Sequence, residues 1–98
     1  MKTQLEENVE AGDNLDASDN KLENIHASYL ENVREYYGYN ALTLAELSQS
    51  AWKVWRDLET HLEGVKWDNG SGRSQAECMR AMEIIKDRIK FLEGNPNH

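Results

Sequence analysis

The sequence predicts an all-α protein, a small bundle in which a first helix packs on an antiparallel hairpin of two others. Apolar residues recur every three or four positions in three separate stretches, which is the spacing of one helix face. Most glycines fall between these stretches, and the single proline, Pro96, follows the last of them. No alternation of apolar and polar residues persists, so the pattern does not favour strands.

Residues 1–18 are expected to form an acidic arm that is flexible or becomes ordered on a partner, residues 19–94 the bundle domain, and residues 95–98 a tail. Thr3 and Glu6 can cap a short helix, which Gly12-Asp13-Asn14 should stop. Residues 1–24 carry seven carboxylates and two lysines, a net charge of −5, so the other 74 residues carry only −2 of the total of −7. The body therefore lacks the basic excess typical of proteins that bind nucleic acid or anionic membranes.

The first helix of the bundle is predicted over residues 20–37. Asn20 followed by Glu23 fits a helix start, and Gly38 is a suitable C-terminal stop. Its apolar stripe consists of Leu22, Ile25, Tyr29, Val33 and Tyr36.

The second helix is predicted to begin at Thr43, which forms a capping box with Glu46, and to end between Gly64 and Lys66. Its apolar positions alternate in steps of three and four, an average of about 3.5 residues that is typical of packing along a parallel or antiparallel neighbour. This stripe consists of Leu44, Leu47, Ala51, Val54, Leu58, Leu62 and Val65.

The third helix follows a loop predicted over residues 67–73. Ser74 and Glu77 form another capping box, and Gly94 followed by Pro96 ends the helix. Its main stripe contains Cys78, Ala81 or Met82, Ile85, Ile89 and Leu92.

The sequence does not favour catalysis, and we expect no cofactor and no metal. His26, His61 and His98 have no second ligand at metal-binding spacing. Asp13, Asp16 and Asp19 lack the spacing and the glycine of a calcium-binding loop. The lone cysteine, Cys78, heads an apolar stripe and is expected to be a buried, inert thiol.

Two further hypotheses about binding come from a loop and a helix start. Arg73 and Ser74, after a glycine-rich loop, could hold an anion such as a nucleotide phosphate at a helix N-terminus. Residues 43–48 resemble the opening of helix-turn-helix repressors, which implies DNA reading through the second helix. The turn glycine of that motif is missing, and the segment that should read DNA carries tryptophans and only two cations.

Surplus aromatic and apolar side chains give the main functional hint. Ile84 and Phe91 lie about 100° away from the main stripe of the third helix, so that helix has a second apolar face. Tyrosine and tryptophan are enriched at protein–protein interfaces. The alternative is that the first helix covers all of these side chains. The candidate partner-binding residues are Tyr36, Tyr37, Tyr39, Trp52, Ile84 and Phe91.

We therefore expect a cytoplasmic, non-enzymatic protein-binding module that inhibits or adapts a larger protein. Compact acidic chains of this kind are common among phage- and plasmid-encoded antagonists, and the acidic arm suits a partner with a basic groove. The alternatives are a homo-oligomer, with Met79, Ile84 and Phe91 as dimer contacts, a DNA-binding regulator and a binder of anionic small ligands. No apolar run is long enough for a membrane span.

Overall fold

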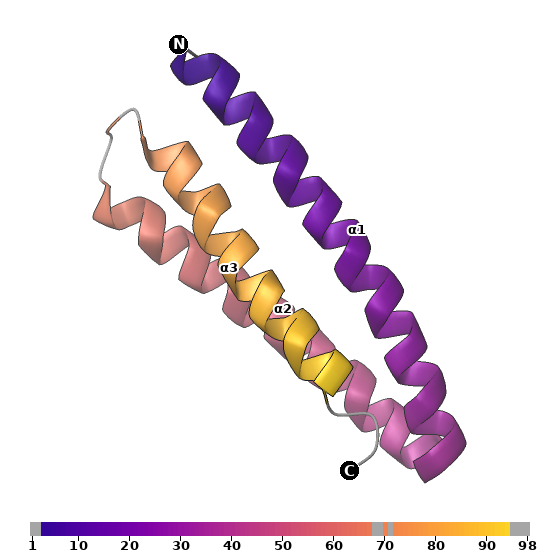
Figure 1. Cartoon of the computed structure of the whole chain (residues 1–98). Helices are drawn as coiled ribbons and strands as arrows, with labels where there is room; N and C mark the ends of the chain where they lie inside the picture. Colours follow the sequence, from indigo (N-terminus) through magenta and orange to yellow (C-terminus); the bar gives the residue numbers. More distant parts are fainter. Residues whose placement is uncertain (1–2, 68–69, 71, 95–98) are drawn as a thin grey trace.

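The computed structural model describes residues 3–67, 70 and 72–94, and three helices account for nearly all of them. They are α1 (Gln4–Tyr37), α2 (Tyr39–Lys66) and α3 (Arg73–Gly94). Each helix packs against the other two, and the described residues contain no strand. Figure 1 shows α1 running down the molecule, α2 returning and α3 running parallel to α1. The prediction of an all-α three-helix bundle is confirmed.

Polar contacts between the helices fix their antiparallel registers. Between α1 and α2, Lys53 pairs with Glu23 and Arg56 pairs with Asp19, each at 3.1 Å. As the residue number rises in α2 it falls in α1, as antiparallel packing requires. Between α2 and α3 the corresponding contacts are Arg88 to Gln49 at 2.9 Å and Arg80 to Glu59 at 3.2 Å.

The core lies along α3 and is completed by α1. Ile85 is fully buried. Leu22 of α1, which is 1% exposed, belongs to the same core cluster. Burying such side chains contributes about 1.5–3 kcal/mol each relative to leaving them in water. The buried apolar residues are Leu22, Val33, Ala81, Ile84, Ile85, Ile89 and Leu92, five of which belong to α3.

Helix α1 begins much earlier than predicted. Thr3 caps it as expected, because its Oγ1 accepts a hydrogen bond of 3.1 Å from the backbone N–H of Glu6. The helix then continues through Gly12 and Asp13 without a break. Leu15 is partly buried against the core, and this packing stabilises the continued helix. The predictions of a stop at residues 12–14 and of an unstructured arm to residue 18 are therefore wrong for the described part of that segment.

A single residue joins α1 to α2. Gly38 has φ 90° and ψ −175°, a conformation that is almost restricted to glycine. Its N–H donates to Arg34 O at 2.9 Å, and its carbonyl accepts from Leu42 N at 3.1 Å. The predicted end of the first helix is thus confirmed, but α2 starts at Tyr39 rather than at Thr43. Thr43 Oγ1 donates to Tyr39 O at 3.2 Å inside the helix, so the predicted capping box is wrong.

Helix α3 ends at Gly94, as predicted, and begins at Arg73, one residue before the predicted cap. Ser74 therefore lies within its first turn. Between α2 and α3, Gly70 N donates to Trp67 O and Arg73 N donates to Gly70 O, each at 3.1 Å. Residues 68, 69 and 71 of the predicted loop, and the tail 95–98, lie outside the described residues.

Candidate functional site

A continuous row of apolar side chains lies on α2 and faces solvent. Its six large side chains are between 49% and 68% exposed, and the small Ala51 between them is also exposed. We call this surface the α2 outer face. It consists of Leu44, Leu47, Ala51, Val54, Leu58, Leu62 and Val65, with Trp55 (48% exposed) at its border.

The opposite side of α2 faces α1 and α3. Gln49 is 4% exposed, and Trp52 and Arg56 are half-buried on the same side. At 100° per residue, these positions are rotated by about 120–180° from the centre of the α2 outer face. The periodic stripe that predicts helix packing therefore faces mainly solvent in the described chain, and only Leu62 borders a groove with α3.

A polar and aromatic cluster forms the inner side of α2. The Arg88 guanidinium lies 5.6 Å from the Trp52 ring centroid, and the Arg56 guanidinium lies 5.3 Å from it. Arg88 Nε also donates to Gln49 Oε1. Burial lowers the pKa of Arg88 from its ordinary value, while the cation–aromatic contacts and the amide oxygen stabilise the charge. This cluster attaches the polar side of α2 to α3. The apolar side of α2 therefore points outward.

His26 lies beside this cluster and has a structural environment. Its ring stacks on Tyr29 with the centroids 6.4 Å apart, and its Nε2 is buried without a hydrogen-bond partner. Burial, assisted by the nearby positive charge of Arg88, lowers the pKa of His26 below its ordinary value of 6.5. The imidazole is therefore neutral at pH 7.

The predicted partner-binding residues separate into two groups. Tyr36, Tyr37 and Tyr39 are exposed around the α1–α2 junction, and Phe91 is 51% exposed on α3. The other two, Trp52 and Ile84, point inward.

Ile84 is only 3% exposed, and Trp52 packs against the core cluster. The prediction that Ile84 belongs to an exposed second face of α3 is therefore wrong: α2 covers that part of α3. The seven exposed residues of the α2 outer face were in turn missed as a surface. Their periodicity was visible in the sequence, but it carries no information about which face of α2 the rest of the chain covers.

The anion-site hypothesis gains no support from the described residues. Arg73 Nε lies 3.9 Å from Glu77 Oε1, so a carboxylate already faces the cation that was to hold the anion. The neighbouring Cys78 is half-buried, and burial raises the pKa of its thiol, as expected for an unreactive cysteine.

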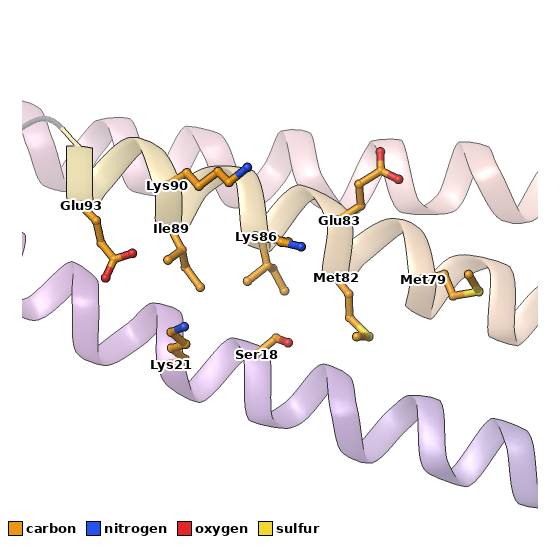
Figure 2. A pocket seen from close by; sticks show the side chains of 10 residues that line it. Ser18, Lys21, Met79, Met82, Glu83, Lys86, Ile89, Lys90 and Glu93 are labelled. Atoms are coloured by element: carbon orange, nitrogen blue, oxygen red, sulfur yellow. The ribbon is translucent and has the colours of Figure 1, made fainter.

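A second, smaller surface is a groove of about 590 Å³ between α1 and α3. Figure 2 shows Met82 and Ile89 of α3 extending toward α1, with Ser18 and Lys21 of α1 facing them. Three lysines and two glutamates surround this apolar floor. The remaining residues that line it are Met79, Glu83, Ile85, Lys86, Lys90 and Glu93.

Among the described residues, no three His, Cys, Asp or Glu side chains lie close enough together to hold a metal ion. Within the same part of the chain, no helix is long and apolar enough to cross a bilayer. No protein-family model, curated protein or solved structure matches the chain. The surfaces of the chain are therefore what points to its function.

Proposed function

We propose that the chain is a non-enzymatic protein-binding module, an adaptor or inhibitor that lays the α2 outer face against a helix of another polypeptide. An apolar stripe with a spacing of about 3.5 residues fits a second helix lying nearly parallel or antiparallel to it. In this chain the stripe is exposed along α2 from Leu44 to Val65.

The exposure of the α2 outer face is the observation that carries this proposal. Apolar patches on soluble monomers rarely exceed a few hundred Å², and larger ones mark interaction sites. Six side chains of Leu or Val size, in an unbroken row along one helix, form a patch at or above that limit. A groove-binding or helix-pairing mode of recognition uses rows of this kind.

The acidic first part of α1 supports a partner with a basic surface. Glu6, Asp13 and Asp16 are exposed on a helix, so their charges are held at defined positions. Fixed negative charges raise the rate of encounter with a positively charged partner, and this effect weakens as salt increases. Association with such a partner should therefore slow at high ionic strength.

Site-specific photo-crosslinking in the cells that express the full chain tests the proposal. Leu58, at the centre of the α2 outer face, is replaced by p-benzoylphenylalanine, which couples covalently to a protein within a few ångströms. Glu35, exposed on α1, receives the same replacement as a control. We expect a discrete covalent adduct from position 58 and none from position 35.

One result would contradict the proposal. If position 58 yields no adduct, or the same diffuse adducts as position 35, the α2 outer face is not a binding surface. Where position 58 does yield a discrete adduct, mass spectrometry identifies the polypeptide that occupies the α2 outer face. A different protein supports this proposal alone, whereas a second copy of the chain also supports the inference below.

A further inference from the structure

We infer that the occupant of the α2 outer face is a second copy of this chain, bound as an antiparallel α2–α2 dimer. The inference rests on the proposed function in that both place a helix on the α2 outer face, and it names the occupant of that face alone; a partner with a basic surface would meet the acidic first part of α1. Three observations favour self-association: the symmetry of the apolar row, the distribution of charge, and the amount of surface that the single chain exposes.

The α2 outer face is symmetric along its own helix. Each apolar position has an apolar counterpart at the same distance on the other side of a point between Val54 and Trp55. The pairs related in this way are Leu44 with Val65, Leu47 with Leu62, and Ala51 with Leu58. A two-fold axis through this point would place each residue opposite its counterpart in the second copy, which is the self-complementarity that a symmetric dimer requires.

Side-chain volumes favour the antiparallel over the parallel arrangement. In the antiparallel register, the small Ala51 faces the large Leu58 of the other copy, and this happens twice in the dimer. A parallel dimer in register would instead place Ala51 against Ala51 and Leu58 against Leu58. Pairing large with small residues fills an interface evenly, whereas pairing like with like leaves a void at one layer and crowding at another.

Charge is arranged so that it does not oppose this contact. Helix α2 carries three cations and four carboxylates, none of which belongs to the α2 outer face. The strongly acidic segment lies in α1, which packs against the opposite side of α2 through Glu23 and Asp19. His61, at the edge of the row, would face Ser48 of the other copy in the antiparallel register rather than a second His61.

The single chain exposes more surface than a compact monomer of its mass, which favours association. The chain exposes 6799 Å², whereas compact monomers of 11.3 kDa expose about 5700 Å². The surplus is about 1100 Å², and a stable protein–protein interface covers about 800 Å² on each partner. The chain as a whole therefore exposes enough surplus surface for one such interface, and the α2 outer face contributes six exposed Leu and Val side chains to it.

Light scattering coupled to gel filtration tests the stoichiometry of the purified full chain. We expect a mass of twice 11.3 kDa that falls toward 11.3 kDa on dilution. Leu58→Glu should give the monomer mass at every concentration, because the dimer would bury one carboxylate from each copy against the apolar Ala51 of the other. Met79→Glu, a matched change at an exposed apolar residue of α3, should leave the dimer intact.

Helix content separates loss of the dimer from loss of the fold. Leu58 is 65% exposed, so the L58E chain should keep the circular dichroism spectrum of a helical protein. Should that chain unfold, Leu47→Glu provides a second position on the same face, 61% exposed.

Disulfide trapping tests the orientation in a Cys78→Ala background. Val54→Cys lies next to the two-fold axis and should form a dimer on oxidation. Leu44→Cys alone should not, because the two copies of position 44 would lie about 32 Å apart along the helices. Mixing Leu44→Cys with Val65→Cys chains should restore the cross-link.

Two outcomes overturn the inference. A chain that stays monomeric at millimolar concentration has no self-association, even if position 58 cross-links to a different protein, in which case the proposed function stands. Efficient self-cross-linking of Leu44→Cys would show a parallel dimer and refute the antiparallel register.

Discussion

Arg88 Nε of α3 donates a 2.9 Å hydrogen bond to Oε1 of Gln49, the most deeply buried polar side chain of α2. This bond joins the two helices at the level where the Trp52 ring lies against the same guanidinium. The polar side of α2 is thereby held inward. The contact explains why the regular apolar row of that helix faces solvent, where a second helix can reach it.

Removing the acceptor should weaken the bundle. Gln49→Leu leaves the half-buried Arg88 cation without this hydrogen bond, and bonds to charged groups contribute about 1.5–3 kcal/mol. We expect a loss of unfolding free energy of that size in urea titrations at fixed protein concentration. Ser48→Ala, at the exposed neighbouring position, is the control. Unchanged stability of the Q49L chain would show that the bond does not hold the helices together.

Two glycine substitutions should have opposite effects. Gly38→Ala forces a Cβ into a backbone conformation with φ 90°, at a cost of about 1–3 kcal/mol. Gly12→Ala lies inside α1, where an added Cβ meets nothing within 4 Å, and should stabilise the chain by about 0.5–1 kcal/mol. Thermal and urea unfolding measure both changes. A destabilised G12A chain would contradict the continuous α1 helix through that position.

Ile84 and Phe91, seven residues apart on α3, should respond very differently to truncation. Ile84→Ala opens a cavity in the core and should cost about 2–5 kcal/mol. Phe91→Ala removes a half-exposed ring that lies 5.2 Å from the Arg88 guanidinium, a contact worth about 0.5–1 kcal/mol. Equal losses in the two chains, measured by urea unfolding, would mean that the two side chains share one environment.

Stability should fall with acid because of His26. Its folded-state pKa is lowered by burial and by Arg88, so the unfolded chain binds a proton more readily than the folded chain does. The unfolding free energy is therefore fully retained above the unfolded pKa of 6.5 and decreases as the pH falls through and below that value.

The same titration can be isolated by substitution. His26→Gln should lose less stability than the parent chain between about pH 7.5 and pH 5, because carboxylate titrations are common to both. His61→Gln, which removes an imidazole from an exposed position, is the matched control. Identical slopes for the H26Q chain and the parent would rule out His26 as the source.

Local sequence signals determined the fold class and the helix ends. Gly38 ends α1 after Tyr37, because it adopts a backbone conformation that other residues avoid, and the predicted second helix also ends at Lys66 as found. The helix starts were predicted less accurately than the helix ends. Thr43 and Ser74 have the residue pattern of a cap, but each lies inside a helix that begins earlier.

Tertiary structure decided the direction in which each face points. The periodicity of α2 defines an apolar row from Leu44 to Val65, but it does not specify the neighbour that the row meets. Within one chain, Arg88, Trp52 and Gln49 bring the opposite side of α2 into the bundle, and Ile84 is buried instead. A helix has two sides and this bundle covers only one of them. Local spacing could therefore predict that α2 pairs with a helix, whereas the packing of all three helices determined that the row remains exposed.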